Sequence, residues 1–418
     1  KKFYKDMSKM SKELEAYYGL PSVVKFCKKC VISNQRPSST IEFKNEKGEK
    51  KKVINFNKDG VCSACVYHDE KETGIDWEDR DGKLRSLLDQ FRSNDGSYDV
   101  IVPGSGGKDS AFTAHILKYK YGMNPLTVTW APHLYTDIGW KNMQEWMHTG
   151  GLDNILYTPN GILHKEMTKN AFHNLLHPFQ PFIVGQRIIG PAMAKKFGVK
   201  LVMYGENQAE YGNSIEENTN PIMDMDFFSS NDVLGMKFGG VSMQEYIDTG
   251  KYTKDDFSPY IAPDKQDLID NGVEVHYLGY YLKWDPQECY YYSVENTGFQ
   301  ANSVRTEGTY SKYSSIDDKI DPFHYLTTLI KFGIGRCTYD AAQEVRNDKI
   351  TREEASYLVE KYDTEFPSIY FKEFLEYIDT SEDEFWKTID KHRSPHIWKK
   401  VDGVWKLRHT SSNMGTDD

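Results

Sequence analysis

A glycine-rich loop at residues 105–110 has the sequence Ser105-Gly106-Gly107-Lys108-Asp109-Ser110. The paired glycines permit a sharp backbone turn, so several N–H groups can point at one anion. Lys108 adds a positive charge and Ser110 a hydroxyl donor, while Asp109 offers an oxygen ligand to a magnesium ion that bridges phosphates. The loop therefore predicts a phosphate site with Mg²⁺. A tight strand-to-helix turn without a ligand is the simpler alternative.

The loop differs from the phosphate loop of kinases, which requires Gly-x-x-x-x-Gly-Lys followed by Ser or Thr. Val102 stands at the first glycine position, and Asp109 follows the lysine. An apolar strand precedes the loop and a helix follows it, so the positive helix end adds to the attraction for phosphate. We therefore expect phosphate binding of a different type from that of kinases.

Short apolar strands alternate with helices after Tyr98. We expect strands near residues 100–102, 126–130, 155–158 and 201–204, with helices near 111–117, 140–147 and 188–197. This alternation is typical of an α/β fold with a doubly wound, mainly parallel sheet. Ligands of such sheets bind beyond the carboxyl ends of the strands, where the glycine-rich loop also begins.

Four of the six cysteines form two Cys-x-x-Cys pairs, Cys27 with Cys30 and Cys62 with Cys65. Two such pairs can supply four thiolates to one tetrahedral Zn²⁺. Disulfides or redox-active thiols are the alternatives, and a cytoplasmic chain disfavours the first of them. We predict a structural zinc site.

Composition limits the possible partners. The chain has 418 residues and a net charge of -10, with 62 acidic and 52 basic side chains, which disfavours nucleic-acid binding. It contains no run of about 18 apolar residues, so we expect no membrane insertion. Residues 1–20 lack the apolar centre of a signal peptide, and we expect a cytoplasmic protein.

The motifs together resemble the N-acetyl sugar amidotransferase family, within the PP-loop ATP pyrophosphatase superfamily. Besides the cysteine pairs and the glycine-rich loop, the resemblance rests on residues 129–133, 181–186, 204–207, 210–213, 331–336 and 393–396. It extends over about residues 26–408. Insertions near residues 44–52 and 213–270 depart from the family pattern and leave the identity of the sugar open.

The resemblance implies an ATP-dependent enzyme of bacterial surface-polysaccharide synthesis. Such enzymes convert the acetamido group of a sugar or nucleotide-sugar into an acetamidino group and release AMP and pyrophosphate. Ammonia would come from a partner glutaminase subunit, with a cyclase-like protein as its channel. In this reading the protein needs ATP, Mg²⁺ and Zn²⁺.

Site residues follow from the resemblance and from their positions after the strands. We expect Lys108, Asp109 and Glu206 to be catalytic. The residues expected to contact ATP are Ser105, Gly106, Gly107, Lys108, Asp109, Ser110, Thr129, Trp130, Gly205, Lys331 and Arg336. Sheet packing explains Thr129 and Trp130 equally well, and a solvated helix face would explain Lys331 and Arg336.

Three regions are expected: an N-terminal helix with a four-cysteine zinc module (residues 1–95), the PP-loop domain (96–285, with an irregular insertion near 213–265) and a mostly helical C-terminal part (286–418). Two other functions remain open. A tRNA-thiolating enzyme of the same superfamily would use Cys289 or Cys337 for turnover. A non-catalytic zinc and nucleotide scaffold of a glutaminase complex would not consume ATP.

Overall fold

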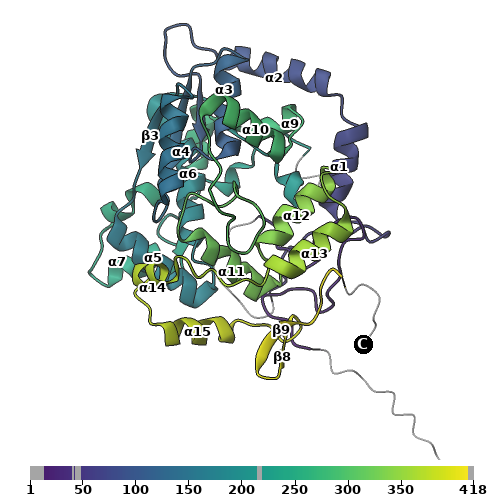
Figure 1. Cartoon of the computed structure of the whole chain (residues 1–418). Helices are drawn as coiled ribbons and strands as arrows, with labels where there is room; N and C mark the ends of the chain where they lie inside the picture. Colours follow the sequence, from purple (N-terminus) through teal and green to yellow (C-terminus); the bar gives the residue numbers. More distant parts are fainter. Residues whose placement is uncertain (1–13, 40–41, 43–48, 214–218, 413–418) are drawn as a thin grey trace, which may run out of the picture.

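A computed structural model describes residues 14–39, 42, 49–213 and 219–412 of the chain (Figure 1). Its centre is a five-stranded sheet in the order β3-β2-β1-β4-β7, and every pair of neighbouring strands is parallel. The strands are β1 Val100–Pro103, β2 Pro125–Trp130, β3 Asp153–Tyr157, β4 Leu201–Tyr204 and β7 Glu274–Tyr277. The predicted fold class is confirmed. The sequence analysis did not include β7.

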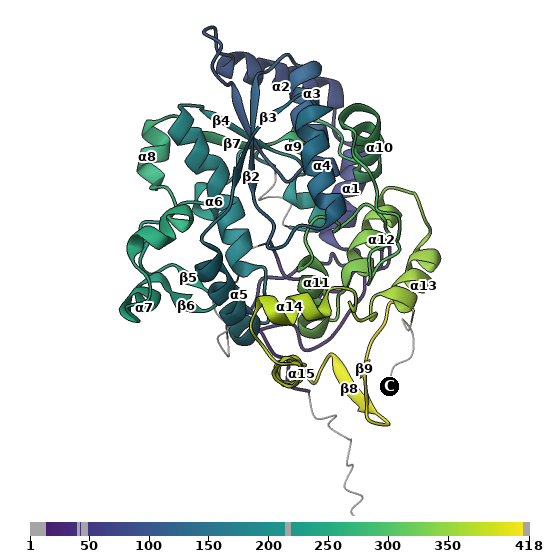
Figure 2. The same cartoon turned by 60° about the vertical axis from the view of Figure 1, so that its left-hand side comes forward.

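Helices cover both faces of the sheet, because alternate strand residues point to opposite sides. Val100 and Val102 pack with α3 and α4 on one face, while Ile101 packs with α5 and α6 on the other. Figure 2 shows α3 and α4 on one side of the strands and α6 on the other. These helices are α3 Lys108–Tyr119, α4 Asp137–His148, α5 Gly161–Leu175 and α6 Gln180–Phe197.

The N-terminal region carries the cysteine pairs and two helices, α1 Ser63–Thr73 and α2 Trp77–Phe91. A helix was expected over Met7–Tyr18. Its residues up to position 13 lie outside the part of the chain that the structure describes. From Leu14 to Tyr18 the backbone is not helical. Tyr18 has a φ of 61°, and its hydroxyl donates a hydrogen bond to the His392 carbonyl at 2.8 Å. Tertiary contacts with the C-terminal region therefore set this segment.

The insertion after β4 packs against α5 and α6. Its aromatic residues Phe238, Tyr246, Phe257 and Tyr260 are each at most 2% exposed. Its elements are η1 Gln208–Tyr211, η3 Met225–Phe227, β5 Lys237–Phe238, β6 Val241–Ser242, α7 Met243–Asp248, η4 Lys254–Tyr260 and α8 Lys265–Asp270. Because these side chains belong to the core of the α6 face, the insertion is a packed layer of the domain.

The C-terminal region is helical up to a final hairpin and packs on the N-terminal cysteine region in one core. Its elements are α9 Leu278–Tyr281, α10 Pro286–Thr297, α11 Asp321–Phe332, α12 Arg336–Arg346, α13 Arg352–Tyr362, α14 Phe371–Tyr377, α15 Glu382–Lys391, β8 Trp398–Val401 and β9 Val404–Leu407. Capping boxes open α13 at Thr351 and α15 at Ser381. In Figure 1, α11, α12 and α13 lie to the lower right of the sheet, on the side of the purple N-terminal segment.

Candidate active site

The glycine-rich loop connects β1 to α3 at the carboxyl edge of the sheet. Gly106 has a φ of +80°, and a Cβ there would lie 3.0 Å from the Cα atom of Met143. Gly104 has a closer constraint, because its Cβ would lie 2.1 Å from the Cβ atom of Ser110. Both positions therefore require glycine. Gly104 was not among the predicted site residues, although it directly precedes them.

Lys108 and Asp109 lie at the first turn of α3. The Lys108 ammonium lies 2.5 Å from Asp109 Oδ2. Burial opposes its charge, yet the carboxylates of Asp109 and Glu206 raise the pKa of Lys108, so it stays protonated. Asp109 Oδ1 is buried and has no hydrogen-bond partner among the residues that the structure describes. This free oxygen fits the predicted role of Asp109 as a ligand of Mg²⁺.

Glu206 comes two residues after the end of β4. Because β1 and β4 are neighbours whose connections leave in different directions, the glycine-rich loop and Glu206 meet where the strand order reverses. Burial, followed by the charge of Asp109, raises the pKa of Glu206 to about 7. The hydroxyl of Tyr211 donates a hydrogen bond to the Glu206 carboxylate.

Two cavities meet at these residues. The first, which we call the loop cavity, has a volume of about 480 Å³ and extends over the ends of β1 and β4. The second, the helix cavity, has a volume of about 360 Å³ and extends toward α11 and α12. Asp109, Glu206 and Tyr211 line both of them. One ligand in each cavity would therefore meet the other beside the glycine-rich loop.

The loop cavity contains several predicted residues. Its wall includes Ser105, Gly107, Asp109, Ser110, Trp130, Gln186 and Gly205. Thr129 is fully buried in the sheet instead, and its hydroxyl accepts a hydrogen bond from Asn154 Nδ2 at 2.9 Å. The indole N–H of Trp130 is buried without a partner in the described part of the chain. Trp130 thus offers a donor near this cavity, whereas Thr129 contributes to sheet packing.

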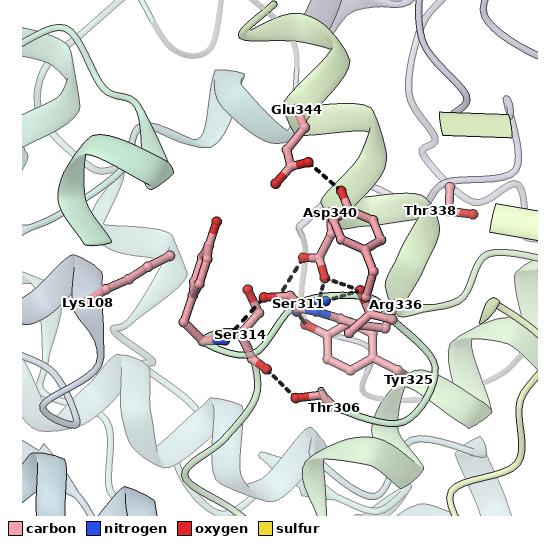
Figure 3. Close-up of polar contacts among 12 residues, drawn as sticks. Lys108, Thr306, Ser311, Ser314, Tyr325, Arg336, Thr338, Asp340 and Glu344 are labelled. Carbon is pink, nitrogen blue, oxygen red and sulfur yellow. Dashed lines mark hydrogen bonds and ion pairs between the residues drawn. The ribbon is translucent and has the colours of Figure 1, made fainter. Parts of the chain in front are cut away.

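Arg336 lies in the helix cavity, opposite Lys108. Figure 3 shows Lys108 and Arg336 on opposite sides of the open space, with Ser314 and Glu344 also facing it. The Arg336 guanidinium donates to the Tyr325 hydroxyl and lies 3.1 Å from the Asp340 carboxylate. Although Arg336 is buried, Asp340 and Tyr325 raise its pKa. Its charge is therefore already compensated by the protein.

Carboxyl and tyrosine side chains dominate the rest of the helix cavity. The lining includes Asp285, Asp340, Glu344, Tyr211, Tyr313, Tyr325 and Tyr339. Burial raises the pKa of Glu344, whose carboxylate accepts a hydrogen bond from Tyr310 at 2.8 Å. None of these seven was among the predicted site residues. The predicted residues that line this cavity are Lys108, Asp109, Glu206 and Arg336. A usable signal was the spacing of Arg336 and Asp340, which places both on one face of α12.

Lys331 lies in neither of these cavities. It lines a third cavity of about 530 Å³, which lies between the N-terminal region, α6 and α11. Only 2% of the Lys331 side chain is exposed, and its ammonium pairs with Glu42. Contact between Lys331 and ATP therefore stays a prediction without geometric support.

The four N-terminal cysteines come together as one group. Their Sγ atoms all lie within 4.8 Å of one another, with 3.9 Å between Cys27 and Cys65 and 3.7 Å between Cys30 and Cys62. These distances match the edge of roughly 3.8 Å that four thiolates form around Zn²⁺ with Zn–S bonds of about 2.3 Å. They are too long for disulfides. The four cysteines form a metal-binding site.

The surroundings of this site suit thiolate ligands. Backbone N–H groups of Lys29 and Cys62 each donate to Cys27 Sγ at 3.3 Å. The Arg346 guanidinium approaches Cys30 Sγ at 3.9 Å and donates to the Glu210 carbonyl at 3.1 Å. Such contacts orient and stabilise metal-bound thiolates. Arg346 also connects the cysteine site to η1, which follows Glu206.

Cys289 and Cys337 are buried free thiols. Burial raises the pKa of both, so little reactive thiolate forms at neutral pH. Neither of them lines the loop cavity or the helix cavity. This arrangement gives no support to the tRNA-thiolating alternative.

The C-terminal region has a recognisable sequence family. Residues 307–411 match the family model described as LPS biosynthesis protein WbpG-like, C-terminal domain. This part of the chain is WbpG-like. The predicted resemblance to surface-polysaccharide enzymes is confirmed there. The WbpG-like region includes α12 with Arg336 and Asp340, so it forms one wall of the helix cavity.

Other similar proteins match less of the chain or are more distant. A segment of 78 residues is 31% identical to the uncharacterized protein MJ1599 of Methanocaldococcus jannaschii, covering 19% of this chain and 27% of that protein. Among solved structures, NMN synthetase from Francisella tularensis is 12% identical, with 68% of this chain and 96% of the other covered and a TM-score of 0.27. The U34-tRNA thiolase NcsA from Methanococcus maripaludis is 15% identical, with 77% of this chain and 88% of the other covered and a TM-score of 0.30. With such distant likenesses, the fold assignment rests on the sheet order itself.

Membrane insertion finds no support in the described elements. Among them, no helix combines the length and the apolar character needed to cross a bilayer.

Proposed function

We propose that this chain is an ATP-dependent amidotransferase that converts the N-acetyl group of a sugar into an acetamidino group. The proposal joins a phosphate-binding loop at the strand-order reversal to a WbpG-like region described for LPS biosynthesis. One observation carries it. Asp109 and Glu206 line both the loop cavity and the helix cavity, so a nucleotide in one can react with an acceptor in the other.

The loop cavity suits ATP. The backbone of the glycine-rich loop and the positive end of α3 would hold the β and γ phosphates. Lys108 would reach them from the adjoining helix cavity, which it lines. Asp109 would bind Mg²⁺ through its free Oδ1 atom, and the ion when bound would neutralise charge on the departing pyrophosphate. Trp130 and Gly205 would lie beside the adenosine.

The helix cavity suits a sugar. Carboxylates accept hydrogen bonds from hydroxyl groups, and tyrosine rings offer both apolar faces and hydroxyl donors. Asp285, Asp340 and Glu344 supply the first kind of group, and Tyr211, Tyr313, Tyr325 and Tyr339 the second. A polyhydroxylated acceptor would therefore find partners along the whole wall.

The proposed chemistry has two steps. The acetamido carbonyl oxygen attacks the α-phosphorus, the bond to pyrophosphate breaks, and an O-adenylated imidate forms. Ammonia then adds to the imidate carbon, the C–O bond to AMP breaks, and the acetamidine remains after loss of a proton. Glu206, with a pKa of about 7, is the group placed to accept that proton. The ammonia would come from a partner glutaminase.

The cysteine site would hold Zn²⁺ in a structural role, because all four positions around the ion would be occupied by thiolates. Its contact with η1 through Arg346 would help to fix the segment that carries Glu206 and Tyr211. No step of the proposed reaction takes place at this ion.

The test is a conversion assay with ATP, MgCl₂ and an ammonium salt, using a panel of N-acetylated sugars and nucleotide-sugars. We expect AMP, pyrophosphate and a product in which one O is replaced by NH, identified by mass spectrometry. Lys108→Ala should lower pyrophosphate release by roughly a hundredfold or more. Lys118→Ala, on the same helix but outside both cavities, is the matched control. ATP cleavage without any change in a sugar would contradict the proposal.

A further inference from the structure

The third cavity is basic. It lies between the N-terminal region, α6 and α11, and we call it the basic cavity. Its described lining carries the cations Arg36, Lys51, Lys52, Arg187 and Lys331 and the carboxylates Glu42 and Glu49. It shares His324, Thr328 and Tyr339 with the helix cavity, and Ser39, Ile183 and Arg187 with the loop cavity. A ligand in the helix cavity can therefore extend into the basic cavity.

Arg36 is the most informative residue of this cavity. It is only 7% exposed, and its guanidinium donates to the Pro37 carbonyl at 3.2 Å and lies 5.8 Å from the centre of the Tyr339 ring. Within the described ranges of the chain, no carboxylate pairs with it. Burying a cation without a counter-charge is costly, and burial accordingly lowers the pKa of Arg36.

Arg187, on α6, is a second arginine with surroundings of this kind. Its guanidinium donates to the Ser39 carbonyl and lies 5.4 Å from the centre of the Phe227 ring. It has no carboxylate partner in the part of the chain that the structure describes. Two arginines from separate elements thus present uncompensated charge to one cavity.

The lysines of the cavity do not remove this excess. Lys331 pairs with Glu42 and donates to the Leu175 carbonyl at 2.8 Å, while Lys51 lies 2.9 Å from the same Glu42 carboxylate. Two ammonium groups therefore share one carboxylate. With Arg36 and Arg187 added, the buried part of the cavity has more positive than negative charge.

We propose that the basic cavity binds a phosphate or diphosphate ester on the acceptor, while the acceptor's sugar ring occupies the helix cavity. This inference rests on the proposed function, and it names the acceptor as a phosphate-linked sugar. Guanidinium groups match phosphate oxygens by paired, charge-assisted hydrogen bonds. The glycine-rich loop, proposed to hold the phosphates of ATP, does not line the basic cavity. Arg187 lies where the loop cavity and the basic cavity meet, whereas Arg36 lines the basic cavity and not the loop cavity.

The test compares equilibrium binding of three ligands: a nucleoside-diphosphate N-acetylhexosamine, the free N-acetylhexosamine and ATP. The wild-type protein should bind the phosphate-linked sugar more tightly than the free sugar. Arg36→Gln should weaken binding of the phosphate-linked sugar by about tenfold or more, and binding of the free sugar and ATP by less than about twofold. Arg187→Gln should weaken binding of the phosphate-linked sugar to a similar extent, but because Arg187 also lines the loop cavity, only Arg36→Gln tests whether ATP binding is unaffected.

Arg85→Gln is the matched control, because Arg85 forms an exposed ion pair with Asp81 on α2, outside all three cavities. Thermal unfolding of each variant checks that it folds. Equal binding of the two sugars by wild type, unchanged binding by both variants, or a loss confined to ATP would each overturn the inference.

The conversion assay separates this inference from the proposed function. If the wild-type protein shows the arginine-dependent preference but converts no acetamido group, the phosphate site stands and the proposed reaction fails. If it converts sugars while both variants bind like wild type, the reaction stands and the phosphate site fails.

Discussion

Two buried glutamates, one in η1 and one in the N-terminal region, differ in what surrounds them. Glu210 on η1 faces one lysine, Lys71 of α1, with both carboxylate oxygens 3.1 Å from the ammonium. Glu42 faces two, Lys331 and Lys51. Burial raises the pKa of Glu210, and Lys71 only partly offsets this rise. Burial acts in the same direction on Glu42, but its two lysines lower its pKa to about 2.

The lysines show the other half of this difference. Lys71 has a full set of partners, because it also donates to the Trp284 carbonyl at 2.8 Å. Burial lowers the pKa of Lys331 to about 8. Glu42 raises this pKa but does not offset the effect of burial, because Glu42 is shared with Lys51. The Lys71–Glu210 pair is thus balanced and joins two packed elements, whereas the group around Glu42 retains positive charge beside a cavity. The comparison teaches that a buried ion pair indicates a ligand site only when its charges do not cancel.

The largest expected loss of stability concerns the cysteine site, which Arg346 connects to Glu210 of the balanced Lys71–Glu210 pair. Cys62→Ser removes a ligand of the proposed zinc, which stabilises the folded state directly, so unfolding free energy should fall by at least several kcal/mol. Because Arg346 connects the cysteine site to Glu210, amide exchange should rise in residues 208–211 and change little around Lys331. Metal analysis, denaturation and hydrogen exchange measure this. Equal exchange increases in residues 208–211 and around Lys331 would remove the proposed distinction.

Lys71→Met should come next. It leaves Glu210 buried without its counter-ion, at a cost of about 3–5 kcal/mol in unfolding free energy. Urea denaturation measures the loss. Lys283→Met is the control, because Lys283 pairs with Glu72 of the same helix on the surface, where such pairs contribute about 0–1 kcal/mol. Similar losses in both variants would show that Lys71 is not a special partner.

Lowering the pH should reduce stability mainly through the group around Glu42. The pKa of Glu42 is about 2 in the folded state and ordinarily 4.5, so its contribution is present above pH 4.5 and is lost as the pH falls toward 2. Wild type should lose on the order of 2–3 kcal/mol more stability over this range than Glu42→Gln does. Parallel stability curves for the two proteins would contradict the assigned charge environment.

Lys331→Met should produce a smaller change, in the alkaline range and with the same direction of pH dependence. The unfolded state takes up the lysine proton near pH 10.5, but the folded state does so only near pH 8. The stability of wild type relative to the variant should therefore rise by roughly 2 kcal/mol between pH 8 and pH 10.5. Denaturation at several pH values tests this. A fall in that range would mean that Lys331 is fully compensated.

The double variant Lys71→Met/Glu210→Met should have the smallest effect. Removing both charges leaves an apolar pair of similar volume, so stability should return to within about 1 kcal/mol of wild type. Recovery much smaller than this would mean that Lys71 also contributes through its bond to the Trp284 carbonyl. Urea denaturation of the single and double variants separates these contributions.

Local patterns predicted much of the fold and the position of the glycine-rich loop at the edge of the sheet. The strands at Leu126 and Leu201 depend on neighbours in the chain, and the structure has them as expected. The Cys-x-x-Cys pairs also converge as expected. By contrast, the carboxylates of the helix cavity come from separate segments that no local pattern connects. The strand β7 was missed because Glu274 and His276 interrupt its short apolar pattern.

The sequence by itself determined where a glycine-rich loop between a strand and a helix and two Cys-x-x-Cys turns form, because each depends on backbone turns and spacing within a few residues. Only the tertiary structure decided which cavity each distant charge serves. Lys331 and Arg336 are five positions apart, yet the break between α11 and α12 directs Lys331 to the basic cavity and Arg336 to the helix cavity. The physical reason is that charge balance in a cavity is set by elements that meet only on folding.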